Sequence, residues 1–378
     1  INTGVVVTVA SGVTLTITNA VTTNGQLIFE NNASLVQTTN VTNTGAIEYR
    51  RKSAAMKNFD YTYWSSPVTG QNIVALSPNT LADKYFRFSG SANDWVLYND
   101  PATSTMIPGV GYIIRTPKEG NPWPNGEIVS FPYSQPVAFK GIPNNGDYSF
   151  SAGAGEFNLI GNPYPSAIDA TKFMQDNSGI IYGALYFWTH NTAITNNEYT
   201  ADDYASYTLT GGTGTGGVGN FVDANNNGIM DPVEEVVSNR PLGKIAAGQS
   251  FFVENAAAGS FQFTNTMRIA GNNSQFFKQA NTKKTATVEK NRVWLNLTNS
   301  GGAFKQLLVG YITGATNDWD NLYDGPTFDG QEFVDFYSIN QGKNLTIQGR
   351  TLPIGKTDII TLGYRSTIAG AIDFCIDK

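Results

Sequence analysis

Three short blocks of this sequence occur twice in the same order, and this recurrence constrains the fold more than any other feature. The first block ends at Pro67 and returns at Pro163, each time with a small or polar pair directly before the proline. A Tyr-Phe block follows in both copies, and a glycine before a strand-like run marks the third block, at Gly109 and Gly248. Ordered recurrence indicates duplicated supersecondary structure. We therefore predict two copies of one β unit, with Pro67 equivalent to Pro163 and Gly109 equivalent to Gly248.

The composition favours strands along all 378 residues. Runs of β-branched and aromatic residues, punctuated by Asn and Gly, take the place of the long runs of helix formers that helical domains need. The predicted fold class is therefore all-β, with little helix. The net charge of −6 argues against nucleic acid as a partner, because phosphate binding needs a basic face. No stretch approaches the ~18 consecutive apolar residues of a membrane-spanning helix, so the chain is not expected to span a membrane.

The N-terminal segment, residues 1–50, holds a tandem of short strand-like runs separated by turn residues. Two arrangements fit this tandem: a meander of hairpins, or the last rungs of a right-handed parallel β-solenoid. The alternation of Val5, Val7 and Val9 places one apolar face inward in either arrangement. We favour the solenoid, and because Ile1 opens in mid-pattern we expect it to continue a longer precursor.

The sharpest chemical signal is a calcium-loop pattern in the second repeat, which matches D-x-[DN]-x-[DN]-G-x5-E position for position. Calcium is a hard cation that takes about six to eight oxygen ligands, and alternate side chains of such a loop supply them. The loop lies in the excess length of the second repeat, so we predict an insertion stabilised by its own Ca²⁺; the alternative is an Asn-Asp turn without metal. The predicted ligands are the side chains of Asp223, Asn225, Asn227, Asp231 and Glu234 and the carbonyl of Ile229.

After a linker rich in Lys and Thr at 275–290, clean apolar alternation returns. This last unit is predicted to be a small antiparallel β-sandwich of the immunoglobulin-like or jelly-roll kind. The single cysteine, Cys375, lies in one of its strand-like runs and is expected to be a buried hydrophobe. The whole chain is thus predicted to be the end of a parallel β-solenoid, a duplicated β-sandwich-like unit and a C-terminal β-sandwich. The predicted domains are 1–52 for the rungs, 53–150 for the first repeat, 151–280 for the second repeat with its inserted calcium loop, and 281–378 for the C-terminal sandwich.

The sequence contains no recognisable set of catalytic residues. There is one histidine, His190, and no G-x-S-x-G elbow, so the Ser-His-Asp arrangement is not supported. Paired carboxylates of a glycoside hydrolase meet only in space, and no pair is singled out here. We predict that the protein is not an enzyme and has no catalytic residues.

Two further groups of residues have competing interpretations. Asp318, Asp320 and Asp324 form a second acidic stretch without complete ligand spacing, so Asx turns are favoured over a second metal site.

Aromatic residues can line a sugar-binding face, but strands bury aromatic side chains in the core by default. We therefore favour the core for most of them and expect Trp95 and Trp123 to be the most exposed, because they lie beside Asn-Asp and between prolines.

An ordered set of motifs resembles one family of proteins. The set comprises ENNASLVQT, WSSPV, FNLIGNPYPSAID, AAGQSFFVEN, NSQFFK, and RVWLNLTN followed by GYITGATNDWDNLYDGPTF. The chain resembles large cell-surface and secreted proteins of flavobacteria and other Bacteroidetes, which are cargo of the type IX secretion system and often end in a type C sorting domain. The resemblance implies an extracellular or cell-surface location on the outer face of the outer membrane, with the outer-membrane type IX translocon as the partner during export.

The expected function is that of an exported, calcium-stabilised cell-surface protein with a structural or adhesive role. Some members of the resembling family are thought to be adhesins, so a surface glycan or another cell-surface protein is the expected partner. The first alternative is a carbohydrate-binding module or lectin-like protein, which an exposed aromatic strip beside an acidic loop would favour. The second alternative is a secreted polysaccharide hydrolase, which a cleft with two facing carboxylates would favour.

Overall fold

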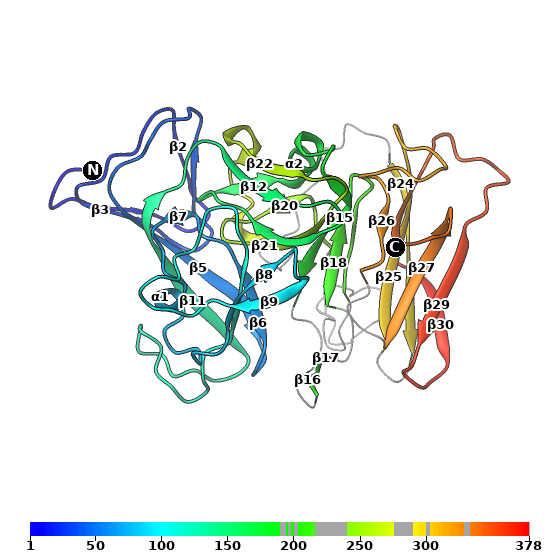
Figure 1. Ribbon diagram of the computed structural model, residues 1–378, viewed down its shortest axis with the longest axis horizontal. Helices are drawn as coiled ribbons and strands as arrows, with labels where there is room; N and C mark the ends of the chain where they lie inside the picture. Colours follow the sequence, from blue (N-terminus) through cyan, green and yellow to red (C-terminus); the bar gives the residue numbers. More distant parts are fainter. Residues whose placement is uncertain are drawn as a thin grey trace, which may run out of the picture. The chain divides into compact units, whose positions relative to one another are not determined.

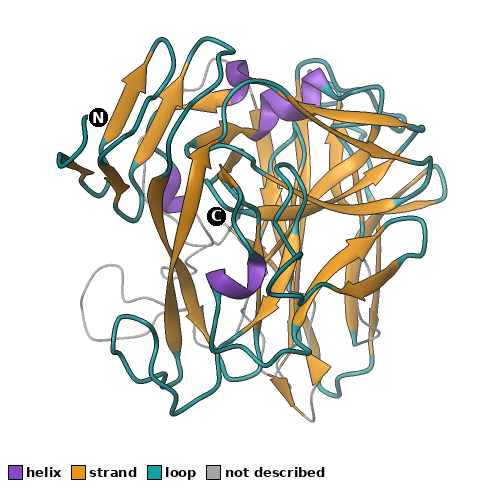
Figure 2. Ribbon diagram, turned by 60° about the vertical axis from the view of Figure 1, so that its left-hand side comes forward, coloured by secondary structure: helices purple, strands orange, loops and turns teal. Residues whose placement is uncertain are grey.

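Nearly all regular structure in the computed structural model of this protein is β-strand (Figure 2). Within the described residues the helical elements are few and short, which confirms the all-β prediction, and none of these helices is long and apolar enough to cross a membrane. The chain forms two compact units, unit 1 with Ile1–Ile181 and Lys244–Lys278, and unit 2 with Tyr182–Gly243 and Gln279–Lys378. The predicted division into four domains stays a prediction. The described residues are 1–189, 194–195, 198–199, 203–215, 240–275, 290–299, 303–328 and 333–377.

Unit 1 consists mainly of β-strands, and an apolar core cluster in it gathers residues such as Phe29, Trp64 and Phe139. Its helical elements are α1 (Ile73–Leu76), α2 (Ala170–Asp176), η1 (Asn265–Met267) and η2 (Asn273–Gln275). Its strands are β1 (Val6–Val9), β2 (Thr14–Ile17), β3 (Gln26–Phe29), β4 (Ser34–Gln37), β5 (Ile47–Met56), β6 (Tyr61–Trp64), β7 (Val68–Thr69), β8 (Tyr85–Ser89), β9 (Asp94–Leu97), β10 (Tyr112–Arg115), β11 (Tyr133–Pro143), β12 (Tyr148–Ala152), β13 (Phe157–Gly161), β14 (Ala167–Asp169), β20 (Lys244–Ile245), β21 (Ser250–Asn255), β22 (Gly259–Phe263) and β23 (Arg268–Ile269).

The strands of the N-terminal segment pair in parallel (Figure 1, dark blue). β3 pairs with both β1 and β5, and β2 pairs with β4. Val6 lies opposite Gln26 and Thr14 lies opposite Ser34, so paired residues are separated by the same length of chain in both stacks. Alternation along these strands turns apolar side chains such as Phe29 into the core, where its exposed fraction is 0%. The N-terminal segment therefore forms two parallel stacks of strands, β1-β3-β5 and β2-β4, and each further strand of a stack follows after the same length of chain.

Each predicted repeat contributes one antiparallel strand pair, and the two pairs have the same register. β10 pairs with β6 so that Tyr112 lies opposite Trp64, and β21 pairs with β13 so that Phe251 lies opposite Ile160. The alignment of the repeated blocks makes Trp64 equivalent to Ile160 and Tyr112 equivalent to Phe251. Every other residue pair of the β6–β10 ladder has its counterpart in the β13–β21 ladder by the same equivalence.

Reciprocal backbone hydrogen bonds join the first block of each repeat to the third block of the other. The Ser65 amide donates to the Gly248 carbonyl over 2.9 Å, and the Gly161 amide donates to the Gly109 carbonyl over 3.0 Å. Both accepting glycines have left-handed backbones, with φ of 83° at Gly109 and 79° at Gly248, which glycine adopts at little cost. In the alignment of the repeated blocks, Ser65 is equivalent to Gly161 and Gly248 is equivalent to Gly109. Each of the two bonds is therefore the counterpart of the other.

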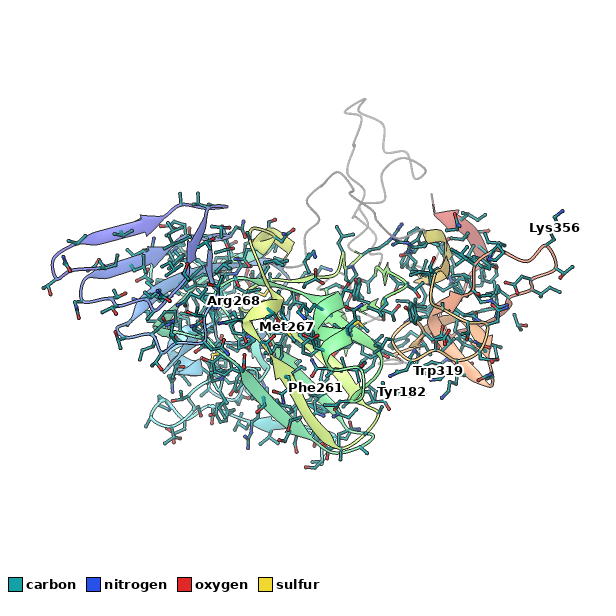
Figure 3. All side chains as sticks on the ribbon, turned by 90° about the horizontal axis from the view of Figure 1, so that it is seen from above. Tyr182, Phe261, Met267, Arg268, Trp319 and Lys356 are labelled. Atoms are coloured by element: carbon teal, nitrogen blue, oxygen red, sulfur yellow. The ribbon has the colours of Figure 1, made fainter. Side chains whose placement is uncertain are left out.

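A buried arginine connects the parallel stack to the second repeat (Figure 3). Arg268 donates to the Leu35 carbonyl over 2.6 Å and to Asn145 Oδ1 over 2.9 Å, and its guanidinium lies 4.9 Å from the centre of the Tyr164 ring. Burial lowers the pKa of Arg268 to about 10, because desolvation disfavours the charged form. The hydrogen bonds and the ring therefore compensate for a charge that is costly to bury.

Replacing this arginine tests how much the connection stabilises unit 1. Arg268→Leu leaves buried acceptors such as the Leu35 carbonyl without their donor, and each such group costs about 1–3 kcal/mol. We expect the free energy of unfolding to fall by at least about 2 kcal/mol, as measured by denaturant titration. The matched control is Arg87→Leu, because Arg87 is exposed and lies over the Tyr98 ring, and its effect should stay within about 0.5 kcal/mol. Equal effects of the two substitutions would contradict this role.

Unit 2 contains a seven-stranded sheet with the order β29-β27-β28-β25-β24-β30, in which β26 also pairs with β28. β25 and β28 are parallel and the other pairings are antiparallel. Residues such as Leu297, Leu307 and Phe336 form its apolar core. The immunoglobulin-like or jelly-roll assignment stays a prediction. The strands of unit 2 are β15 (Ile181–Trp188), β16 (Ile194–Thr195), β17 (Glu198–Tyr199), β18 (Tyr204–Tyr207), β19 (Gly212–Thr213), β24 (Lys290–Asn299), β25 (Phe304–Ile312), β26 (Gly325–Pro326), β27 (Val334–Asn340), β28 (Lys343–Arg350), β29 (Thr361–Ser366) and β30 (Ile372–Asp377).

The expected burial of Cys375 is wrong, because this residue is exposed. It lies on β30, an end strand of the seven-stranded sheet. Alternation turns Phe374 toward the face that carries Phe336, with 5.2 Å between the two ring centres, and turns Cys375 to the opposite face. An end strand has a neighbouring strand on one side alone, and Cys375 therefore remains accessible.

Candidate functional site

Two stacked aromatic rings and one ammonium group form a partly exposed cluster on unit 2. Tyr182 lies at the start of β15, Trp319 lies in the loop between β25 and β26, and Lys343 is the first residue of β28. The Tyr182 and Trp319 ring centres are 5.1 Å apart and the ring planes are inclined by 30° (Figure 3). We call these three residues the aromatic–ammonium site.

Lys343 completes the site by placing its ammonium beside the Trp319 ring and at the hydroxyl edge of Tyr182. Nζ lies 5.1 Å from the Tyr182 ring centre and 4.8 Å from the Trp319 ring centre, and it donates a hydrogen bond to the Tyr182 hydroxyl over 2.5 Å. The negative faces of aromatic rings attract cations, with about 0.5–1 kcal/mol per contact at exposed sites. The three side chains therefore hold one another in place.

A tight hairpin positions Lys343. Asn340 pairs with Lys343 across a two-residue turn, and the turn residues have positive φ, 49° at Gln341 and 75° at Gly342. Two positive φ angles define the type I′ turn, whose twist matches that of the strands it joins. The position of Lys343 is thus set by backbone geometry as well as by its contacts.

The same hairpin holds the loop that carries Trp319. The Trp319 amide donates to Gln341 Oε1 over 3.4 Å, and Gln341 Nε2 donates to Asp318 Oδ1 over 2.8 Å. Asn340 Nδ2 donates to the Asn317 carbonyl over 3.3 Å. One side chain of the turn and one of the preceding strand therefore hold the loop at Asn317–Trp319, next to the Trp319 ring.

The acidic residues predicted to form Asx turns cap the backbone of this loop. Asp324 Oδ2 accepts from the Asp320 amide over 2.9 Å, and Asp324 Oδ1 accepts from the Gly349 amide over 2.7 Å. The Asp320 carboxylate accepts from the Thr316 amide. Burial raises the pKa of Asp324 to about 6, because desolvation disfavours the carboxylate. Within the described residues, no group of three or more His, Cys, Asp or Glu side chains is arranged to hold a metal ion.

A glycine next to Tyr182 ties β15 to the other end of the loop. The Gly183 amide donates to Asn321 Oδ1 over 2.7 Å. Gly183 has a φ of 70°, and a Cβ atom there would lie 2.4 Å from Pro326 Cδ. A larger residue would therefore separate β15 from the loop and move the two rings apart.

The predicted calcium ligands, Asp223, Asn225, Asn227, Ile229, Asp231 and Glu234, lie outside the described residues. His190 also lies outside them. The calcium site thus stays a prediction.

Most aromatic residues weighed as a sugar-binding face lie in the core instead. Trp64, Tyr85 and Trp188 have exposed fractions of 0%, 1% and 6%. The expectation for Trp123 is wrong, because it is 5% exposed and its ring packs 6.5 Å from that of Tyr133. Trp95 is partly exposed, but its ring contacts three others.

Sequence reasoning missed Tyr182 and Lys343 and placed Trp319 only in an acidic stretch. The Gln-Gly pair before Lys343 was a usable turn signal, since glycine favours the positive φ of a hairpin turn. No sequence signal indicates that β15 lies beside the loop that carries Asn321, because the two segments are far apart in the chain.

The buried carboxyl of the loop makes the stability of unit 2 depend on pH. The pKa of Asp324 is raised from 3.8 to about 6, so the folded state binds the proton more tightly than the unfolded state. Its contribution to the free energy of unfolding therefore falls as pH rises from about 4 to about 6 and stays constant above that range. Asp324→Asn removes this titration and should flatten the slope in denaturant titrations between pH 4 and 7.

The matched control for this titration is Asp94→Asn, because Asp94 is exposed on β9 of unit 1. It removes one exposed carboxyl outside the loop and so controls for the substitution itself. If the pH dependence of the free energy of unfolding is the same in Asp324→Asn as in the wild-type protein, the raised pKa of Asp324 is contradicted. The amide also places an N–H₂ group against a backbone donor, so the variant should be less stable at every pH, by about 1–3 kcal/mol.

Comparison with known proteins gives one family and no relatives. A family model described as a domain of unknown function (DUF8693) matches residues 1–378. No curated protein and no solved structure matches the chain.

Proposed function

The chain belongs to the DUF8693 family over its whole length, and we propose that it is an adhesive cell-surface protein that binds a surface glycan through the aromatic–ammonium site. The single observation that carries this proposal is the stacked pair of Tyr182 and Trp319, partly exposed and held by the backbone and by Lys343. The C–H face of a pyranose ring carries weak positive charge and packs against the negative face of an aromatic ring. A site that is already ordered loses little conformational entropy on binding.

The structural part of the proposal concerns the N-terminal segment. We propose that it is the end of a parallel β-solenoid that presents the rest of the chain at a surface. The parallel pairing of β1 with β3 and of β2 with β4, at equal spacing along the chain, supports this interpretation. The proposal also includes the internal duplication, supported by the equal registers of β6–β10 and β13–β21 and by the exchanged backbone hydrogen bonds at Gly109 and Gly248.

The location belongs to the same proposal. The ordered motifs from ENNASLVQT to GYITGATNDWDNLYDGPTF resemble type IX secretion cargo of Bacteroidetes. We therefore propose export through the outer-membrane translocon to the cell surface, where a glycan-binding site has access to its ligands.

A glycan array tests the adhesive function. The wild-type protein should bind a set of glycans, and Trp319→Ala should lose this binding because it removes one of the two stacked rings. The matched control is Trp95→Ala, which removes a partly exposed indole from unit 1 and should leave the bound set unchanged. The function is refuted if the wild-type protein binds no glycan, or if Trp319→Ala binds the same glycans as strongly.

Calcium stabilisation of the inserted loop makes a separate prediction. We propose that Ca²⁺ is held by Asp223, Asn225, Asn227, Asp231, Glu234 and the Ile229 carbonyl. Removing the ion would leave three carboxylates repelling one another at short range. A chelator, or Asp223→Ala, should therefore raise protease sensitivity near 211–235 and leave the two cores intact. Limited proteolysis and a calorimetric calcium titration check this; no binding heat together with identical cleavage would reduce the stretch to an Asn-rich turn.

A further inference from the structure

The ammonium of Lys343 is the only member of the aromatic–ammonium site that carries a charge. Among the described residues, no carboxylate lies within ion-pair distance of Lys343 Nζ. Its contacts are the Trp319 ring and the Tyr182 hydroxyl, at the edge of the tyrosine ring. An ammonium has three donors, so this geometry leaves donors for a ligand.

The neighbouring acidic side chains are engaged elsewhere. Asp318 accepts from Gln341 Nε2, Asp320 accepts from the Thr316 amide, and Asp324 is buried with both oxygens bonded to backbone amides. Arg350 is paired with Asp358 and also donates to the Asn317 carbonyl. These carboxylates thus accept hydrogen bonds from N–H groups of the loop and the hairpin, whereas Lys343 Nζ contacts an aromatic ring and a neutral hydroxyl.

We propose that the aromatic–ammonium site selects acidic sugars, with a hexuronate as the bound residue. The carboxylate of the sugar pairs with Lys343 Nζ, and the C–H face of its ring packs against the exposed part of the Tyr182–Trp319 pair. A charge-assisted hydrogen bond is roughly twice as strong as a neutral one, so a carboxylate is preferred over a hydroxyl at this position. This inference rests on the proposed glycan-binding function and adds the ligand class.

The test uses a matched pair of ligands that differ in charge. Oligogalacturonate and its methyl-esterified form share the same ring and linkage, but the ester lacks the negative charge. Calorimetry on the full chain should give at least tenfold weaker binding for the ester. Affinity for the acid should fall as salt rises, because a partly exposed ion pair is screened.

The variant Lys343→Gln keeps a polar side chain and removes the charge. It should weaken binding of the acid at least tenfold, so that the acid no longer binds more tightly than the ester. The matched control is Lys356→Gln, because Lys356 is an exposed lysine of the same unit, in a loop away from the two rings (Figure 3). Its affinity for both ligands should equal that of the wild-type protein. Circular dichroism and thermal unfolding establish that Lys343→Gln is folded.

The outcomes separate the inference from the function on which it rests. Equal affinity for acid and ester, both lost in Trp319→Ala, overturns the acidic preference and keeps glycan binding. If oligogalacturonate does not bind but neutral glycans bind on the array, the acidic preference is likewise overturned and glycan binding is kept. If no glycan binds at all, both the function and the inference fall. Charge-dependent binding that Lys343→Gln abolishes and Lys356→Gln preserves supports both.

Discussion

Two backbone hydrogen bonds set the arrangement on which unit 1 depends. They join Ser65 to Gly248 and Gly161 to Gly109, so each proposed repeat is completed by the other. The close approach leaves no room for larger residues, since a Cβ atom on Gly161 would lie 2.4 Å from Ser65 Cβ. This crowding explains why a small residue, Ser65 or Gly161, stands two positions before the proline in both copies. The two ladders then follow in equal register, and their buried residues include Trp64, Ile160 and Phe251.

The candidate site depends on a hairpin turn of unit 2, whose backbone positions the side chains of the site. In unit 2 a type I′ hairpin, rather than a regular strand face, presents Lys343 and holds the Trp319 loop through Gln341. Loops that carry binding residues are often mobile, but here carboxylates cap the loop from within and the hairpin holds it from outside. A binding surface built in this way is rigid without being buried. The recognition that we propose at this site relies on the aromatic rings and the charge of Lys343.

Sequence reasoning succeeded where local chemistry decides structure. Strand-forming runs predicted the all-β class. The repeated blocks coincide with the β6–β10 and β13–β21 ladders, whose registers agree, and the duplication itself stays a proposal. The GNPYPS motif has a local explanation too, because Asn162 Nδ2 donates to the carbonyls of Ser166, Ile245 and Ala246. Sequence reasoning failed where the burial of a side chain depends on segments that are distant in the chain. Flanking prolines suggested an exposed Trp123, but Tyr133 packs against it, and strand alternation suggested a buried Cys375 that an end strand leaves exposed. The meeting of Tyr182 with Trp319 follows from tertiary packing that no single segment encodes.

The central claim is that a glycan binds at Trp319, and the indole N–H signals of the six tryptophans locate such binding directly. In a titration of the ¹⁵N-labelled protein with oligogalacturonate, followed by nuclear magnetic resonance, Trp319→Phe assigns the signal of interest. The account predicts that the Trp319 indole signal shifts in a saturable manner while those of the buried Trp64 and Trp123 stay in place. A saturable shift confined to other tryptophans would contradict the account.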